Sequence, residues 1–316
     1  METITRTAPP EMSLLSLTQT KPKRHLVVAR VAGFCFGVKR AMDMVETARR
    51  ERPETITTLG PIVHNQQVIG RMEREGIHTA ASLDAISAGT VVLSAHGVSP
   101  AIPLQARAQG LDVLDATCPF VTKVHRMAKM LHQQNYQILL VGDAGHTEVR
   151  GVVGAVEALG GTVNRVSCVG DVRALALGKK VGIISQTTQQ SATFAAIVAE
   201  VCRVASDVRA FNTICGATDE LQDAAADMAR QVEVAIVIGG RGSANTRRLR
   251  DLCEAQGIPA YHIETAGEIL PEWIADKFTI GLTAGASTPD WIIEDVARHL
   301  NDGELPDDWR LNHPEE

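Results

Sequence analysis

Three of the six cysteines, Cys35, Cys118 and Cys215, lie in loops of similar chemistry, each within two residues of a glycine or proline. Three thiolates at helix starts suit a metal or iron–sulfur centre, because helix N-termini lower a thiol pKa and backbone N–H groups donate to cluster sulfurs. A cubane cluster normally takes four cysteines, so a set of three leaves one iron with an open, Lewis-acidic position. Zinc with three thiolates stays an alternative, although the sequence lacks the closely spaced cysteine pairs expected for zinc.

Two further polar loops follow each of these cysteines in the same order. The second loops carry His64, His146 and Ser243, which lie 29, 28 and 28 residues after the preceding cysteine. The third loops carry His96, Thr187 and Ser287, at 61, 69 and 72 residues, a drift that loop insertions would produce. The spacing indicates three homologous modules, which would bring three cysteines that are remote in sequence together in space.

The second and third loops supply mainly hydroxyl, amide and imidazole groups. These residues are His64, His96, His146, Thr187, Thr188, Ser243, Asn245 and Ser287. Beside helix N-termini such donors suit a phosphate or diphosphate, since both the N–H groups and the helix dipole favour an anion. One carboxylate, Glu148, stands out in the loop Gly145–Glu148, and burial near an anion and a metal should raise its pKa and make it a proton donor.

Positioning these loops requires strands that end at one place. Nine short, largely β-branched runs precede a loop and then a helical spacing of apolar residues, the pattern of βα units. They are Leu26–Val31, Thr55–Leu59, Thr90–Ser94, Asp112–Asp115, Gln137–Val141, Lys180–Ile184, Asp207–Phe211, Val234–Ile238 and Phe278–Leu282. Since ligands bind outside the carboxyl ends of parallel strands, the pattern predicts an α/β fold whose modules meet around the cysteines.

The predicted modules divide the chain into three similar lengths. They are Phe36–Cys118, Pro119–Asn212 and Thr213–Asn301, with Lys23–Cys35 adding a strand to the last. Residues 1–22 are predicted to be a disordered tail and 302–316 a C-terminal tail.

Composition excludes several classes of protein. The 316 residues carry 31 basic and 37 acidic side chains, a net charge of −6, with 3% aromatics and no basic block. Nucleic acid is therefore an unsuitable partner. No apolar run approaches the ~20 residues of a membrane helix. The sparse cysteines indicate a reducing, cytoplasmic setting rather than a disulfide scaffold, and we interpret Cys168, Cys202 and Cys253 as small buried residues.

The remaining motifs are weaker. The run Gly239–Asn245 is rich in glycine, but it is neither a Walker sequence nor a complete dinucleotide fingerprint. The histidines outside the three sets are interpreted as solvated. They are His25, His78, His125, His132, His262, His299 and His313.

Five separated segments together resemble the 4-hydroxy-3-methylbut-2-enyl diphosphate reductase family of the methylerythritol phosphate route to isoprenoids. They are Gly33–Ala41, Leu59–Asn65, Ser94–Val98, Asp115–Pro119 and Thr283–Ser287, and the similarity covers roughly His25 to Leu300. The resemblance implies a trefoil of α/β modules with mostly parallel sheets around a [4Fe-4S] cluster held by Cys35, Cys118 and Cys215.

The resemblance also implies a reaction and its partners. The hydroxyl group of an allylic diphosphate binds the open iron, ferredoxin or flavodoxin supplies two electrons, and water leaves to give isopentenyl and dimethylallyl diphosphate. The diphosphate would lie among the residues that match the family's motif: His64, His96, Ser243, Asn245 and Ser287, with His146 nearby. Glu148 would relay protons with help from Thr187.

The chain departs from the family pattern near two of these sites. Ala244 stands where a second serine is usual, Thr147 where a proline is usual, and Gly216–Gln222 lacks the usual tyrosine and Arg-Gln pair. Two other functions therefore stay open. One is a cluster-bearing relative that senses redox state or iron without turnover, and the other is a zinc-dependent hydrolase of a phosphorylated metabolite with Glu148 as general base.

Overall fold

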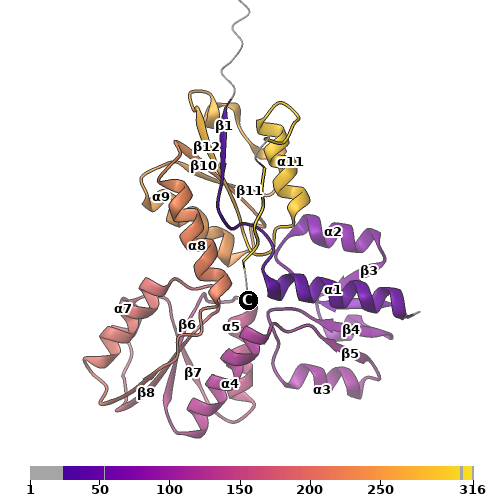
Figure 1. The fold of residues 1–316 in the computed structure, drawn as a ribbon. Coiled ribbons are helices and arrows are strands. Elements are labelled where there is room, and N and C mark those ends of the chain that lie inside the picture. The colour runs from indigo at the N-terminus through magenta and orange to yellow at the C-terminus, as the bar shows by residue number, and fades with distance from the viewer. Residues whose placement is uncertain (1–23, 53, 307–308, 315–316) are drawn as a thin grey trace, which may run out of the picture.

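The computed structural model describes residues 24–52, 54–306 and 309–314. Within these ranges the chain forms three lobes, each built on a four-stranded sheet whose strands are all parallel (Figure 1). The predicted fold, an α/β trefoil with parallel sheets, is confirmed. The predicted N-terminal tail lies outside the described residues, and the boundaries drawn between the modules stay a prediction.

The three sheets have equivalent strand orders. The first sheet runs β3-β2-β4-β5, with bounds Ile77–Ala80, Ile56–Leu59, Thr90–Leu93 and Asp112–Asp115. The second runs β7-β6-β8-β9, with bounds Val163–Val166, Gln137–Val141, Lys180–Ser185 and Asp207–Ala210. The third runs β11-β10-β12-β1, with bounds Ala260–Ile263, Val234–Ile238, Thr279–Ala284 and His25–Val28. The equivalent strands precede equivalent loops of the sequence pattern. Strands β2, β6 and β10 precede the second loops, β4, β8 and β12 the third loops, and β5, β9 and β1 the cysteine loops.

The third sheet is completed by the strand nearest the N-terminus. Strand β1 pairs in parallel with β12, so that Leu26 lies beside Ile280 and Val28 beside Leu282. Cys35 therefore emerges from the same sheet as Ser243 and Ser287, although it precedes them by 208 and 252 residues.

The expected number of strands was too small. The described residues contain twelve strands rather than nine, and the three additional ones, β3, β7 and β11, each form the outer edge of a sheet. Each has only four residues and includes polar ones, as in Ile77–Ala80, because one side of an edge strand has no neighbouring strand. None of the three precedes a predicted site loop.

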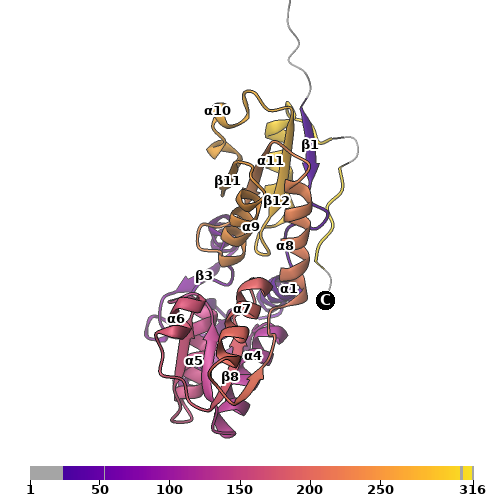
Figure 2. The same ribbon diagram turned by 90° about the vertical axis from the view of Figure 1, so that its left-hand side faces the viewer.

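Helices cover both faces of each sheet, and the described residues form them with the following bounds. They are α1 Phe36–Glu51, α2 Gln66–Arg74, α3 Ala101–Ala108, α4 Pro119–Gln133, α5 Thr147–Glu157, α6 Val169–Arg173, α7 Ser191–Cys202, α8 Gly216–Ala229, α9 Ala244–Ala255, α10 Pro271–Ile274 and α11 Asp290–Leu300, with 3₁₀ turns at Leu83–Ala85 and Ala266–Glu268. None of these helices combines the length and apolar character that a membrane crossing requires. Figures 1 and 2 both place the start of α1 and of α8 where the lobes meet.

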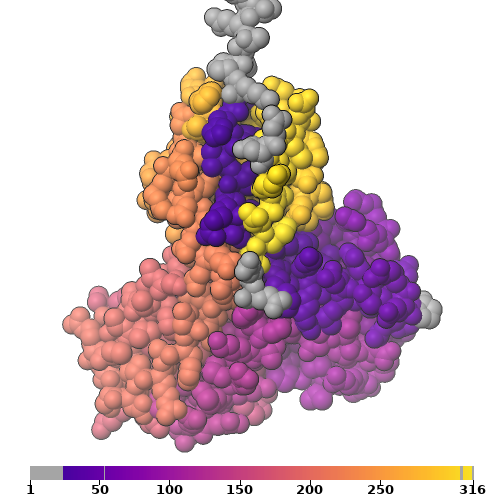
Figure 3. Space-filling model, viewed as in Figure 1, coloured from indigo at the N-terminus to yellow at the C-terminus, as the bar shows by residue number. Residues whose placement is uncertain are grey.

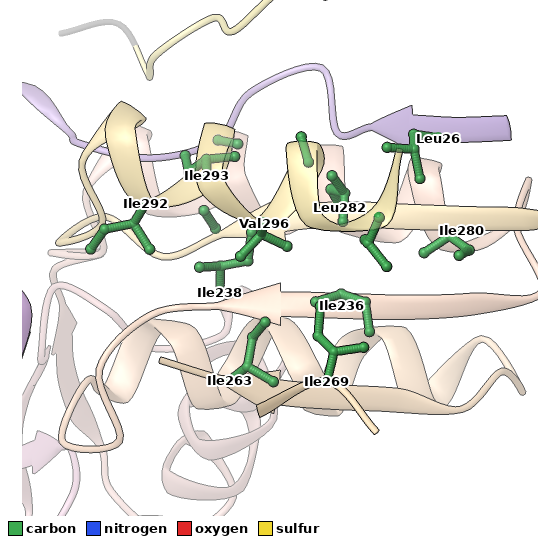
Figure 4. Packing of buried hydrophobic residues seen from close by; sticks show 14 of the residues in the cluster. Leu26, Ile236, Ile238, Ile263, Ile269, Ile280, Leu282, Ile292, Ile293 and Val296 are labelled. Carbon is green, nitrogen blue, oxygen red and sulfur yellow. The ribbon is translucent and has the colours of Figure 1, made fainter. Parts of the chain in front are cut away.

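Each lobe has its own hydrophobic core. In the third lobe Ile236 and Ile238 of β10 and Leu282 of β12 face Ile293 and Val296 of α11, and all five are at most 2% exposed (Figure 4). Fully burying a side chain of this size contributes about 1.5–3 kcal/mol. Separate buried clusters stabilise the first and second lobes, so each sheet can hold its loops rigidly.

The C-terminal segment returns to the junction of the lobes. Its backbone carbonyl at Asn312 accepts a hydrogen bond of 2.9 Å from the N–H of Ala32, and its Asn312 amide donates to the carbonyl of Arg30. Figure 3 shows this yellow segment beside the indigo chain that leaves β1. The contact steadies the backbone that leads to Cys35.

Candidate active site

One cavity lies where the three lobes meet, with an empty volume of about 810 Å³. All twelve predicted site residues line it: Cys35, Cys118, Cys215, His64, His96, His146, Glu148, Thr187, Thr188, Ser243, Asn245 and Ser287. Each of them follows the carboxyl end of a parallel strand, the place where open α/β sheets bind ligands. Their convergence is a property of the whole chain, since each lobe contributes at least three of them through its own loops.

The three cysteines occupy one kind of position, because Cys35, Cys118 and Cys215 are the N-cap residues of α1, α4 and α8. Burial raises the pKa of all three thiols, that of Cys215 to about 12, while helix N–H groups such as that of Val38 lower it in part. The expected net lowering of thiol pKa at these helix starts is therefore wrong, because the loss of hydration outweighs the N–H groups. A positively charged partner is needed to hold these sulfurs as thiolates.

The donor set favours a group larger than one ion. Within the described residues no three His, Cys, Asp or Glu side chains are grouped so that they could hold a single metal ion. Ligands of one zinc ion lie about 2.3 Å from it, whereas a cubane spreads its cysteines over separate irons. Three thiols that line one cavity, with helix N–H groups beside them, fit an iron–sulfur cluster.

Three imidazole rings form a second group in the cavity. The ring centroid of His64 lies 4.3 Å from that of His96 and 5.4 Å from that of His146. Burial lowers the pKa of each ring, to about 4 for His146. Neighbouring rings lower the pKa of His96 and His146 further, and the Arg247 charge lowers that of His64. A cluster of neutral imidazoles that resist protonation becomes easier to protonate when an anion is bound beside it.

The hydrogen bonds within the cavity show which polar atoms are already paired and which can still bind a ligand. The Nδ1 atom of His146 accepts from the backbone N–H of Glu148 at 3.2 Å, so the neutral ring carries its proton on Nε2 and can donate it. Among the described residues, buried polar atoms without a partner include Nε2 of His64 and both amide atoms of Asn245. Because an unpaired buried polar atom costs about 1–3 kcal/mol, these atoms indicate a polar ligand.

The carboxyl group of Glu148 is the most buried acid of the cavity, at 2% exposure. Its two oxygens accept from the backbone N–H and from the hydroxyl of Thr187, each at 2.7 Å. Burial raises the pKa of Glu148 to about 7, and the two Thr187 donors and the nearby Arg248 hold it from rising further. A carboxyl group with a pKa near neutrality can both hold and release a proton under working conditions.

The remaining polar residues are fixed by their own loops. Ser243 is the N-cap of α9, and its hydroxyl accepts from the N–H of Thr246 at 3.2 Å. The hydroxyl of Thr188 accepts from the side-chain amide of Gln186 at 2.9 Å. The hydroxyl of Ser287 lies 3.5 Å from the carbonyl of His64, across a lobe boundary. These bonds orient the side chains before any ligand arrives.

Glycines let the lobes approach at the cavity. A Cβ atom on Gly37 would lie 2.5 Å from the sulfur of Cys118, and one on Gly240 would overlap the carbonyl oxygen of His64. Any larger residue would push these loops apart, so the glycines set the spacing of cysteine and histidine loops.

Several residues that line the cavity were not predicted from the sequence. Phe36, Val63, Phe120 and Val121 give the cavity an apolar side, and the hydroxyl of Thr218 lies 2.9 Å from the sulfur of Cys215. The position of Thr218, three residues after a cysteine N-cap, is a signal that could have found it, because N-cap and N3 residues contact each other.

Four interpretations outside the site are wrong. His262 is 8% exposed and its Nε2 pairs with the carbonyl of Gly239 at 2.8 Å, and the Nε2 of His125 is also buried, so neither ring is solvated. Cys168 and Cys202 are exposed, whereas Cys253 is buried as expected.

The chain is similar to known proteins over most of its length. The family model for the LytB protein matches residues 26–301. The 4-hydroxy-3-methylbut-2-enyl diphosphate reductases of Pelobacter propionicus and Geobacter sulfurreducens are 41% and 43% identical, over 82% of this chain and 91% and 90% of theirs.

Two solved structures share the fold. A structure described as (E)-4-hydroxy-3-methyl-but-2-enyl diphosphate reductase, the terminal enzyme of the non-mevalonate pathway, aligns with a TM-score of 0.66 and 38% identity, over 88% of this chain and 99% of that one. The E-1-hydroxy-2-methyl-but-2-enyl-4-diphosphate reductase of Plasmodium falciparum aligns with a TM-score of 0.83 and 28% identity, over 92% and 96%. Together with the three-lobed fold and its cavity of cysteines and histidines, these matches show that the chain belongs to the LytB family.

Proposed function

We propose that this chain is a 4-hydroxy-3-methylbut-2-enyl diphosphate reductase. It replaces the allylic hydroxyl group of its substrate by hydrogen, consuming two electrons and two protons and releasing water, with isopentenyl and dimethylallyl diphosphate as products. The observation that carries the proposal is the convergence of three cysteines, three histidines and one buried acid on a single cavity, in a chain about 40% identical to such reductases.

Cys35, Cys118 and Cys215 would hold the cofactor, a [4Fe-4S] cluster. When bound, the cluster supplies electrons and one Lewis-acidic iron that polarises the C–O bond to be broken. The thiols are suited to this role because their raised pKa values fall only when positive charge is present, which ties a stable thiolate set to a bound cofactor.

The imidazole, amide and hydroxyl groups of the same cavity would bind the diphosphate. His146 donates from Nε2, and Nε2 of His64 and Nδ2 of Asn245 gain an acceptor. His96, Ser243 and Ser287 complete the set, with Thr187 and Thr188 at its edge toward Glu148. The diphosphate also supplies the negative charge that makes protonation of the imidazoles favourable.

Glu148 would deliver the protons. It is buried beside the cavity, and Thr187 holds both of its oxygens, so its carboxyl group has a fixed direction. The apolar side formed by Phe36, Phe120 and Val121 would contact the hydrocarbon part of the substrate and exclude water from it.

A separate protein would supply the electrons. Ferredoxin or flavodoxin in the cytoplasm is our proposed donor, since the sparse cysteines of this chain suit a reducing compartment.

The test is turnover under anaerobic conditions. Protein purified without oxygen, given a low-potential reductant and the hydroxylated allylic diphosphate, should form the two product diphosphates in parallel with substrate loss. A protein that holds a cluster but forms no product would instead be a sensor, and hydrolysis of the phosphate bond without reduction would make it a hydrolase.

A further inference from the structure

An ion pair at the edge of the cavity joins the second lobe to the third. The Nη2 atom of Arg248 on α9 lies 2.7 Å from Oδ1 of Asp143, in the loop that leads to α5. The Arg248 side chain is only 12% exposed, and that of Asp143 is 31% exposed. Partly buried pairs are less screened by water than surface pairs, so this contact constrains the two lobes more than an exposed one would.

Both partners are hydrogen-bonded to the site residues next to them. The second guanidinium nitrogen of Arg248, Nη1, donates at 3.2 Å to the carbonyl of Ala244, the first residue of α9, which lies between two predicted diphosphate ligands. The backbone N–H of His146 donates at 3.2 Å to the carbonyl of Asp143. A continuous chain of three polar contacts therefore runs from His146 through Asp143 and Arg248 to the start of α9.

The Asp143 end of this chain is fixed within the second lobe. The N–H of Asp143 donates to the side-chain carbonyl of Gln186 at 2.9 Å, and the amide of Gln186 in turn donates to the hydroxyl of Thr188. The neighbouring Arg247 lies farther away, 3.9 Å from Asp143, and its own hydrogen bond goes to Arg241 rather than to the start of α9.

We propose that Asp143 and Arg248 are positioning residues, which hold the diphosphate-binding groups of the second and third lobes at the distance that one diphosphate can span. Neither lines the cavity; they act through His146 and through the start of α9. This inference rests on the proposed function, because it requires an anion that both lobes bind at once. Arginine suits the role because the two nitrogens of its planar guanidinium donate to Ala244 and to Asp143 at the same time, which the single ammonium group of lysine cannot do in this geometry.

The test measures affinity for inorganic pyrophosphate by calorimetry, on anaerobically purified full-length protein. Asp143→Asn and Arg248→Gln should each weaken binding about tenfold, because each breaks the same link. The double variant should bind about as weakly as Asp143→Asn alone, and Arg248→Lys should lie between the wild type and Arg248→Gln. In turnover assays KM for the allylic diphosphate should rise more than kcat falls.

Arg250→Gln is the matched control. Arg250 lies on the same helix and pairs with Asp251 at 37% and 51% side-chain exposure, away from the cavity, so its loss should leave pyrophosphate affinity unchanged. Thermal unfolding of every variant separates positioning from folding. A lower Tm with wild-type affinity would show a merely structural pair and overturn the proposal.

The remaining outcomes are also decisive. Additive losses in the double variant would show that the two residues act independently, which contradicts a shared link. Should Asp143→Asn fail to fold, Arg248→Lys still tests the proposal. It keeps the positive charge, so a loss of pyrophosphate affinity would show that the two bonds of the guanidinium are needed. If the wild type binds neither pyrophosphate nor substrate, the proposed function is wrong; if the wild type binds and the variants bind equally well, only the positioning role is wrong.

Discussion

Glu148 is the single side chain on which turnover should depend most, because it is the buried acid that faces the cavity. Glu148→Gln keeps the shape and the contact with Thr187 but cannot release a proton. We expect cluster content and substrate binding to survive while kcat falls about 10²- to 10⁴-fold. Glu157→Gln, on the exposed end of the same helix, is the control and should turn over normally. Unchanged kcat in Glu148→Gln would remove the assigned role.

The pH dependence of turnover should report the same group. Burial raises the pKa of Glu148 to about 7, so its proton is present below that pH and is lost above it. The rate should therefore fall on the alkaline side of about pH 7. In Thr187→Val one donor to the carboxylate is gone, the pKa rises, and the falling limb should move to higher pH. A limb that stays in place, measured as kcat against pH, would mean that another group controls the rate.

Ala244 offers a change that should improve binding. Its side chain lines the cavity at the first position of α9, between Ser243 and Asn245. Ala244→Ser would add one hydroxyl donor to the diphosphate, a contribution of about 1 kcal/mol that lowers KM roughly fivefold. Steady-state kinetics on the allylic diphosphate would measure it, and a raised KM would show that the hydroxyl does not reach the anion.

At the scale of elements, the start of α1 should not tolerate added side-chain volume. Gly37→Ala brings a Cβ to 2.5 Å from the sulfur of Cys118, so α1 and α4 must separate and the cluster should be lost or bound weakly. Gly216→Ala is the matched control at the start of α8, where no atom lies within 4 Å of the added Cβ. Iron content per chain is the measurement, and equal iron in the two variants would argue against close packing of the cysteine loops.

The elements that carry the site could be predicted from the sequence, because each inner strand ends in a loop of repeated chemistry. The outer strands β3, β7 and β11 could not, since their short, partly polar runs resemble loops. A signal was present: Gly76, Gly160 and Gly257, all with positive φ, end a helix shortly before each of them.

Contacts between lobes could not be predicted. The sequence gives no periodic pattern that pairs Asp143 with Arg248, which are 105 residues apart. Within the third lobe, His262 is buried against the carbonyl of Gly239, which follows the neighbouring strand β10, and the alternation of residues along β11 does not show that contact. Such contacts arise only when complete elements pack.

For the whole molecule, the cluster should tie together lobes that are already folded. Each lobe has its own buried core, so Cys118→Ser should lose the cluster but keep its sheets. Hydrogen exchange should then accelerate in the loops around Cys35 and Cys215, which belong to other lobes, while the central strands stay protected. Faster exchange confined to the loop of Cys118 would contradict a shared attachment point.

The central claim is that three cysteines from three lobes bind one four-iron cluster and leave one iron without a protein ligand. Mössbauer spectroscopy of isotopically labelled protein, purified anaerobically, tests it most directly, because it distinguishes irons by their ligands. We predict one iron distinct from the other three, and a spectrum in which that iron alone changes when the allylic diphosphate is added. Protein without iron, or four equivalent irons that ignore the substrate, would contradict the account.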